Sequence, residues 1–185
     1  YSKYDAILIG PGLGRNRWGK TLYEACLNWD VPLIVDADGL FWMAKEGRPV
    51  SDIVIVSPHV GEAARLLGVD SSLIEQDRIQ SAKEIRNRFG AIGVVKGPGS
   101  VVFGHEKISI CEHGNPGMAT AGMGDVLSGV IAGFVVQKIA DFEACLEIAV
   151  LLHSAAADEA AKDLGQRSLM ATDVIRFLPR VMQGD

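Results

Sequence analysis

Short apolar runs and amphipathic segments alternate along most of the chain. Continuous apolar runs bounded by glycine, proline or acidic residues are typical of strands buried on both faces. They predict strands at residues 6–9, 32–35, 53–56 and 92–95. Apolar residues at helical spacing predict helices at residues 18–27, 40–44, 61–67, 76–89, 125–137, 142–162 and 172–182. This alternation indicates an α/β fold with a mostly parallel sheet.

One pair of apolar runs departs from the alternation. Residues 100–103 and 107–111 have strand character and are separated by a short segment that contains Gly104 and His105. Because this segment is too short for a crossover helix, the pair predicts an antiparallel hairpin. No linker rich in proline, glycine or serine divides the sequence, so we expect residues 1–185 to belong to a single domain.

Composition narrows the class of protein. The 185 residues carry a formal net charge of −5, which argues against a protein that binds the phosphate backbone of nucleic acid. No segment reaches the roughly 18 consecutive apolar residues that a membrane span needs, so no membrane partner is expected. Cys26, Cys111 and Cys145 are widely spaced and form no CxxC motif, which favours reduced thiols in a cytoplasmic protein over a zinc site.

Two polar motifs follow the first two predicted strands, where ligands of open α/β sheets bind. GPGLG (Gly10–Gly14) does not match GxGxxG, because Arg15 occupies the place of the third glycine. We interpret it as one wall of a ligand site, with a purely structural turn as the alternative. In DADGL (Asp36–Leu40), Asp38 either caps the next helix or joins Asp36 in direct ligand contact.

The next two motifs follow the third and fourth strands. In SPHVGEAARLL (Ser57–Leu67), His59 and Glu62 are three residues apart and meet on one helix face. They form either a helix cap or a polar wall for substrate and magnesium-bound water. VVKGPGS (Val94–Ser100) is no P-loop, because its lysine lies at the other end of the loop. Lys96 is either a point charge for phosphate or an ordinary surface lysine.

The most specific motif is GNPGMATAGMGDVLSGVIAGF (Gly114–Phe134). Its glycine-rich turn runs into a helix, and such a turn presents free N–H groups to an anion. An adjacent carboxylate, Asp125, is then poised to take a proton from a hydroxyl group; the alternative is a simple N-cap. Gly129 and Gly133 are unfavourable inside a helix, which predicts close packing against another backbone. His153 lies among apolar residues and is interpreted as a core histidine with satisfied hydrogen bonds.

In this order and spacing, the five motifs resemble those of the ADP/ATP-dependent NAD(P)H-hydrate dehydratases, members of the ribokinase-like superfamily. The resemblance runs from about Asp5 to Val136. It implies a three-layer α/β/α fold and the dehydration of (S)-NADHX or (S)-NADPHX. The ring hydroxyl would be phosphorylated at the expense of ADP or ATP, and phosphate would then depart. Mg²⁺ is the implied cofactor, and it would be bound mainly by substrate phosphates.

The resemblance also implies a role for each motif. Asp125 would be the catalytic base. The adenine nucleotide would contact Lys96, Gly97, Pro98, Gly99, Ser100, Gly122 and Gly124. The hydrate would contact Gly12, Gly14, His59, Glu62 and Asp125. No residue would bind the metal directly, and Glu62 would order it through water.

One departure from the family concerns the start of the chain. Domains of the family carry further strands before the GPGLG strand, whereas Tyr1 lies only a few residues ahead of it. We therefore expect residues 1–185 to be the carboxyl-terminal part of a larger domain. The absence of these early strands would leave either an open apolar sheet edge or a gap that a separate segment fills.

The resemblance implies partners as well, and two other functions stay open. We expect a homo-oligomer, fused to or working with an NAD(P)H-hydrate epimerase. One alternative is a small-molecule kinase of the same superfamily, which would release a phosphorylated alcohol. The other is a nucleotide-binding module without catalysis.

Overall fold

The computed structural model describes residues 4–47 and 54–183, and in these residues six strands form one sheet. The strands lie in sequence order: β1 (Ile7–Ile9), β2 (Leu33–Val35), β3 (Val54–Val56), β4 (Ile92–Val95), β5 (Ser100–Phe103) and β6 (Ile108–Cys111). Strands β1 to β4 are parallel, and β4, β5 and β6 are antiparallel. The predicted mostly parallel sheet and its hairpin are confirmed.

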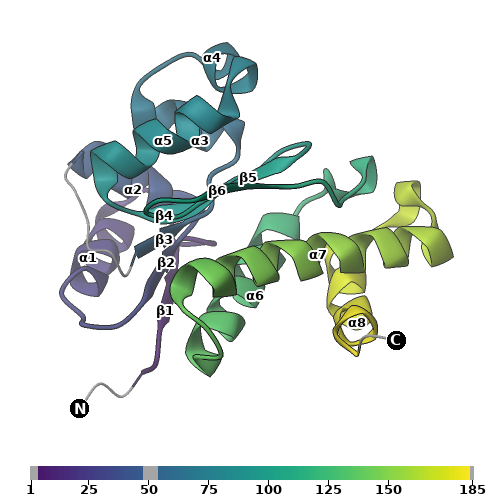
Figure 1. The fold of residues 1–185 in the computed structure, drawn as a ribbon. Helices are drawn as coiled ribbons and strands as arrows, with labels where there is room; N and C mark the ends of the chain where they lie inside the picture. The colour runs from purple at the N-terminus through teal and green to yellow at the C-terminus, as the bar shows by residue number, and fades with distance from the viewer. Residues whose placement is uncertain (1–3, 48–53, 184–185) are drawn as a thin grey trace.

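Helices cover both faces of this sheet (Figure 1). One face carries α1 (Arg17–Cys26), α2 (Asp38–Glu46), α3 (Val60–Leu67), α4 (Ser71–Gln76) and α5 (Arg78–Phe89). The other carries α6 (Met123–Gln137) and α7 (Phe142–Leu164), with α8 (Ala171–Met182) packed against them. The expected three-layer α/β/α architecture is confirmed.

The sheet separates two apolar cores. Because successive side chains of a strand point to opposite faces, Val35 and Val56 enter the core under α1–α5. Ile34 and Ile55 enter the core under α6 and α7, and both are completely buried. This two-sided burial is why the central strands are continuous apolar runs rather than alternating ones.

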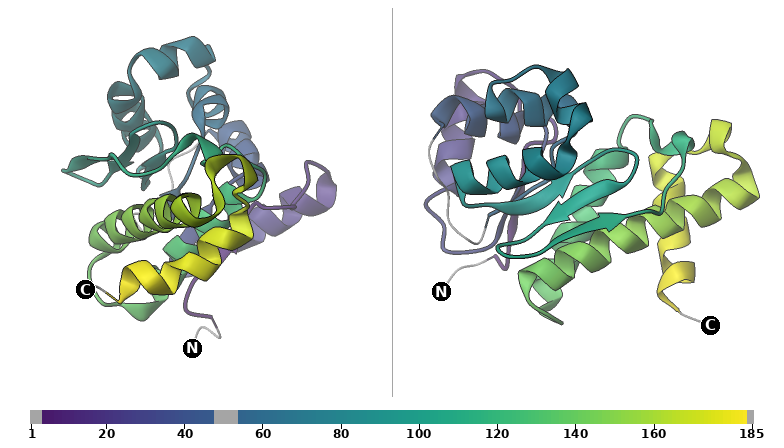
Figure 2. Two further views of the ribbon diagram at one scale, coloured as in Figure 1. Left: turned by 90° about the vertical axis from the view of Figure 1, so that its right-hand side faces the viewer. Right: turned by 45° about the horizontal axis from the view of Figure 1, so that its top comes forward.

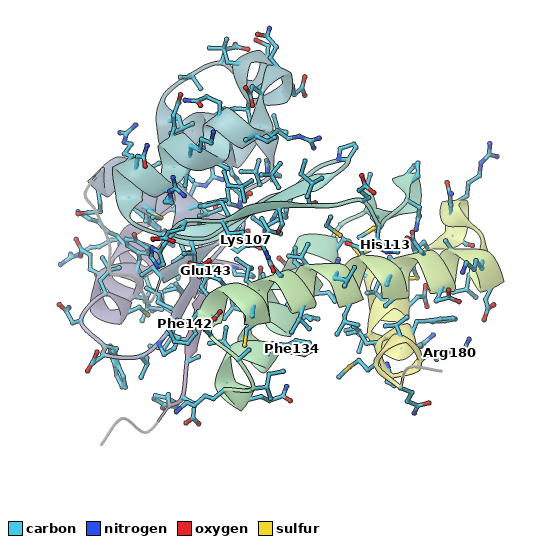
Figure 3. The ribbon with its side chains drawn as sticks, viewed as in Figure 1. Lys107, His113, Phe134, Phe142, Glu143 and Arg180 are labelled. Atoms are coloured by element: carbon cyan, nitrogen blue, oxygen red, sulfur yellow. The ribbon has the colours of Figure 1, made fainter. Side chains whose placement is uncertain are left out.

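Helix α7 packs in the second core, against the β5–β6 hairpin and against α8. Phe134 of α6 and Phe142 at the start of α7 belong to this core (Figure 3). The β5–β6 hairpin lies along α7 (Figure 2), and Lys107 beside β6 pairs with Glu147 of α7 at 2.9 Å. Beyond the sheet, α7 continues into a third apolar cluster with α8.

The sequence missed one helix and misplaced some boundaries. The missed helix is α4, whose N-cap Asp70 accepts a hydrogen bond from the Ser72 amide. The helix predicted from residue 76 begins at Arg78, because Asp77 ends α4 and caps α5. Residue 53 of the third predicted strand lies outside the described residues, as does Tyr1.

Two further predictions concern exposed positions. The inference that Gly129 and Gly133 pack against another backbone is wrong, because a Cβ at either position would meet no described atom within 4 Å. Strand β1 forms one edge of the described sheet, and Leu8 on it is 37% exposed. This edge has the open, apolar character expected from the sequence.

Candidate active site

The polar motifs that follow the first four strands meet at one edge of the sheet. This follows from the parallel pairing of β1 to β4, which brings the carboxyl ends of these strands together. A Cβ at Gly10 would collide with the Asp36 carbonyl, so the first two motifs touch. The Lys96 amide donates to the Pro58 carbonyl at 2.8 Å, which joins the third motif to the fourth.

The centre of this edge is the buried carboxylate of Asp36. Its Oδ1 accepts from Lys96 Nζ at 3.0 Å and from the Ala37 amide at 2.8 Å. Its Oδ2 accepts from Ser128 Oγ of α6 at 2.5 Å. Asp36 is 1% exposed, so each of these bonds acts in a medium where water competes weakly. Asp36 thus ties the ends of β2 and β4 to helix α6.

The backbone beside Asp36 is strained. Ala37 has φ +47°, a region that residues with a side chain rarely adopt. Such a conformation costs roughly 1–3 kcal/mol and persists only where the surroundings enforce it. The amide of this strained residue donates to the Asp36 carboxylate, so Ala37 is one of three groups that hold it, with Lys96 and Ser128.

The first turn of α6 lies against Lys96. Gly122 is the N-cap and has φ +83°, which favours glycine. A Cβ at Gly124 would lie 3.1 Å from Lys96 Nζ and 3.8 Å from Asp36 Oδ2. Within the described chain, the amides of Gly124 and Asp125 have no hydrogen-bond acceptor, as is usual for the start of a helix. Two free amides and an ammonium group therefore lie together as a candidate anion site, called the anion site below.

The residue that follows Gly124 in this turn, Asp125, carries a carboxylate. Asp125 is exposed, on the first turn of α6. Its side chain makes no hydrogen bond or ion pair with any residue in the described ranges, and it is not the N-cap, which is Gly122. The capping alternative is therefore wrong. An unengaged carboxylate beside an anion site has the chemistry of a general base.

Comparison with known proteins shows to which family the chain belongs. A profile of the Carb_kinase family, described as NAD(P)H-hydrate dehydratase, matches residues 1–180. The chain belongs to this family. It is 42% identical over 179 residues to the bifunctional NAD(P)H-hydrate repair enzyme Nnr of Escherichia coli, covering 96% of this chain and 34% of that protein. The corresponding enzyme of Coxiella burnetii is 39% identical over 173 residues, covering 93% and 35%.

The chain thus spans about a third of the length of the curated relatives it matches. A solved structure of ADP/ATP-dependent NAD(P)H-hydrate dehydratase from Bacillus subtilis, co-crystallised with ATP and Mg²⁺ and soaked with CoA, gives a TM-score of 0.89 at 31% identity. The match covers 98% of this chain and 67% of that one. Hydroxyethylthiazole kinase from Pyrococcus horikoshii, at 16% identity and a TM-score of 0.73, shares the ribokinase-like fold.

In this member of the dehydratase family, His59 and Glu62 form a helix cap. His59 Nδ1 accepts from the Gly61 amide at 3.0 Å, and Glu62 Oε2 accepts from the His59 amide at 2.8 Å. The same Glu62 oxygen lies 3.9 Å from Lys96 Nζ, so the cap borders the anion site. The capping interpretation is therefore confirmed, and a polar wall for substrate and magnesium-bound water stays a prediction.

The KGPGS loop follows β4 and lies under an arginine that the sequence gave no reason to single out. Arg78, the first residue of α5, donates to the Pro98 carbonyl. A Cβ at Gly97 would collide with its guanidinium group. Ser100 Oγ closes the loop through the Gly97 carbonyl at 3.1 Å. Residues 97–100 are thus held beside Lys96, with a second cation across the loop.

The GPGLG loop is open on its outer side. Gly12 and Gly14 have positive φ, and a Cβ at Gly12 would meet no described atom within 4 Å. The Gly14 amide donates to Asp38 Oδ2 at 3.1 Å, and Arg15 pairs with the same carboxylate at 2.7 Å. Asp38 therefore secures this loop. The capping interpretation of Asp38 is wrong, because the N-cap of α2 is Ala37.

The sequence also missed the two serines of the buried network. Ser57 and Ser128 are completely buried, and their Oγ atoms lie 3.2 Å apart. Ser128 also donates to the Gly124 carbonyl at 3.1 Å. Ser128 stands between apolar residues of α6, and that polar interruption of the buried face is the signal that identifies it.

The described residues bear on three other expectations. They contain no group of three or more His, Cys, Asp or Glu side chains arranged to hold a metal ion. A Mg²⁺ ion that keeps several waters and is bound mainly by nucleotide phosphates needs few protein ligands, so it would fit such a site. The three cysteines are free. No helix in residues 4–47 and 54–183 has the length and apolar character to cross a membrane.

Proposed function

We propose that this chain forms the nucleotide-binding and catalytic part of an ADP- or ATP-dependent (S)-NAD(P)H-hydrate dehydratase. The observation that carries the proposal is the first turn of α6: Asp125, whose carboxylate is unengaged, directly follows Gly124, where the turn lies against Lys96. A base next to an anion site suits the transfer of a phosphoryl group to a hydroxyl group. Membership of the dehydratase family supports the choice of substrate.

In the proposed reaction, Asp125 takes the proton of the ring hydroxyl as its oxygen attacks the terminal phosphorus of ADP or ATP. The amides of Gly124 and Asp125 and the Lys96 ammonium bind the transferring phosphoryl group, and Gly122 gives this turn its shape. The nucleotide leaves with one phosphate fewer. The phosphorylated hydrate then loses phosphate and a proton, which restores NADH or NADPH.

The remaining site residues bind and orient the two substrates in this proposal. The adenine nucleotide lies along Lys96, Gly97, Pro98, Gly99 and Ser100, with Gly122 and Gly124 at its phosphates. The hydrate contacts Gly12, Gly14, His59 and Glu62. Glu62 would hold a nucleotide-bound Mg²⁺ through water, and the metal would supply neutralisation of phosphate charge.

The proposal extends to the setting of the chain. Its relatives are named bifunctional, and it covers about a third of their length. We therefore infer that residues 1–185 are the carboxyl-terminal part of a larger dehydratase domain, fused to or working with an NAD(P)H-hydrate epimerase. A cytoplasmic homo-oligomer is the proposed form. Sedimentation of the natural full-length protein tests the oligomer, and a monomer would contradict it.

The experiment that tests the function uses the natural full-length protein and the hydrates of NADH and NADPH. With ADP or ATP and Mg²⁺, dihydronicotinamide absorbance should return, with one phosphate released per hydrate consumed. No return of absorbance with either nucleotide contradicts the dehydratase proposal. Accumulation of a phosphorylated alcohol, without release of phosphate, would instead support a kinase.

A further inference from the structure

His153 is a buried histidine in the middle of α7 that the proposed reaction does not use. It is 3% exposed and lies on the face of α7 that carries Ala149, Val150, Ala156 and Ala157. All four of these neighbours are small or apolar. An imidazole is therefore an unusual choice at this position, and packing alone does not call for it.

The imidazole is only partly satisfied. Its Nε2 is buried and has no hydrogen-bond partner in the described part of the chain. The prediction of a core position for His153 is therefore confirmed, and the prediction that its hydrogen bonds are satisfied is wrong at Nε2. A buried polar atom without a partner costs about 1–3 kcal/mol, a cost that a phenylalanine or leucine would avoid. A residue retained against such a cost is a candidate for a functional role.

The groups that act on the imidazole belong to the anion site. Burial lowers the pKa of His153 to about 4, a backbone hydrogen bond with Met123 opposes this shift, and the charge of Lys96 adds to it. Met123 is the first residue of α6, between Gly122 and Gly124, and it packs in the third apolar cluster with Ala156 and Ala157 of α7, which lie one helical turn from His153. Lys96 enters from the end of β4, where Asp36 and Glu62 flank its ammonium. His153 therefore lies behind the glycine turn and is neutral.

We propose that His153 is a positioning residue for the first turn of α6. Its neutral imidazole contacts the backbone of Met123 from the α7 side and fixes the direction of the next two amides, those of Gly124 and Asp125. This inference rests on the proposed function, because it assigns His153 to the same phosphoryl site. Neutrality matters, since an imidazolium would place a second positive charge beside Lys96 in a buried region.

The test compares three replacements of His153 in the natural full-length protein. His153→Phe keeps a ring but offers no hydrogen bond. His153→Asn and His153→Gln each return one amide group, near the place of Nδ1 and of Nε2 respectively. Cys145→Ala is the matched control, since Cys145 is also fully buried on α7 but lies about two helical turns away.

For His153→Phe, we expect kcat to fall roughly tenfold to a hundredfold at a temperature where the variant is folded, because small misplacements of a reacting group have effects of this size. His153→Asn, which returns a polar group near the place of Nδ1, should recover most of that loss, whereas His153→Gln should not, because Nε2 has no partner in the described part of the chain. Cys145→Ala should lose stability and keep kcat. Unchanged kcat in His153→Phe, or equal losses in all three His153 variants and in Cys145→Ala, would overturn the proposal.

A second readout does not depend on turnover. The amide resonances of Gly124 and Asp125 should shift in His153→Phe and return in the rescuing variant, and ADP affinity should follow them. If the unsubstituted protein has no dehydratase activity, the proposed function fails while these resonances still test the positioning role. If the protein is active but the resonances do not move, only the role of His153 fails.

Discussion

The ammonium of Lys96 lies 3.0 Å from Oδ1 of Asp36, although 60 positions separate the two residues in sequence. The carboxylate has 2% of its side-chain surface exposed and the lysine has 19%. Each charge is held in place by the other at the carboxyl edge of the sheet. The same carboxylate accepts a hydrogen bond from Ser128 of α6, so Asp36 also fixes the first turn of α6 to the sheet.

Replacing Asp36 with asparagine should therefore destabilise the protein. The substitution keeps the shape but leaves the Lys96 charge with only Glu62, at 3.9 Å. Breaking a buried pair from one side costs about 3 kcal/mol or more. Urea unfolding measures this loss. The control is Glu147→Gln, which removes the charge of a half-buried carboxylate paired with the exposed Lys107, keeps an oxygen that can accept from Ser109, and should cost less than about 1 kcal/mol. Equal losses of stability in both variants would show that the buried Asp36–Lys96 pair stabilises the fold no more than the Glu147–Lys107 pair does.

The Asp125→Asn variant should separate catalysis from binding. Removing a general base lowers kcat roughly 10²- to 10⁴-fold, whereas the amides of the first turn still bind phosphate. We expect ADP affinity, measured by calorimetry, to change little. Asp30→Asn, at an exposed position before β2, is the matched control and should keep kcat. An Asp125→Asn enzyme with normal kcat would remove Asp125 from the role of base.

Two glycines of the same helix should respond to alanine in opposite ways. At Gly124 the new Cβ would lie 3.1 Å from Lys96 Nζ, so the ammonium, which Asp36 holds, would have to move by a few tenths of an ångström. We expect Gly124→Ala to raise the KM for nucleotide roughly tenfold or more. At Gly129 the Cβ meets open space, so Gly129→Ala should leave activity intact and stabilise α6 by up to about 1 kcal/mol. Similar kinetics in the two variants would contradict the proposed contact between the first turn and the phosphates.

The lowered pKa of His153 predicts a loss of stability in acid. The folded protein keeps the imidazole neutral down to about pH 4, whereas the unfolded chain takes up a proton near pH 6.5. The contribution of the neutral imidazole to the free energy of unfolding is therefore complete above pH 6.5 and is lost as the pH falls toward 4. The loss totals up to about 3 kcal/mol. In unfolding measurements at several pH values, His153→Phe should lack this part of the acid dependence. Parallel pH profiles for the two proteins would contradict the shift.

The sequence predicted the layers of the fold well because each layer has a local signature. Runs such as 32–35 are apolar at every position only if both faces are covered, which already implies helices above and below the sheet. Helix α4 was missed because it is short and its Asp70 cap resembles an ordinary turn. The helix boundary at Arg78 was missed for a related reason: Asp77 fits equally well inside a helix and as its cap.

The candidate site was predicted in part. The sequence singled out Lys96, Gly124 and Asp125, because glycine-rich turns and charges at strand ends are visible in the order of residues, and the structure brings Gly124 next to Lys96. Ser128, Arg78 and His153 were not assigned to the site, because each reaches it from an element whose position depends on packing. The partners of Asp36 were likewise invisible, since they come from β4 and α6, far along the chain.

The sequence by itself determined the class of fold, the motifs and the family, because hydrophobic period and local turn chemistry depend on neighbours along the chain. Only the tertiary structure decided which side chains meet. It brought Asp36 to Lys96 and Ser128, left Asp125 unengaged, and set His153 behind the glycine turn. The physical reason is that a buried charge or hydrogen-bonding group acts through its surroundings, and packing brings those surroundings from distant parts of the chain.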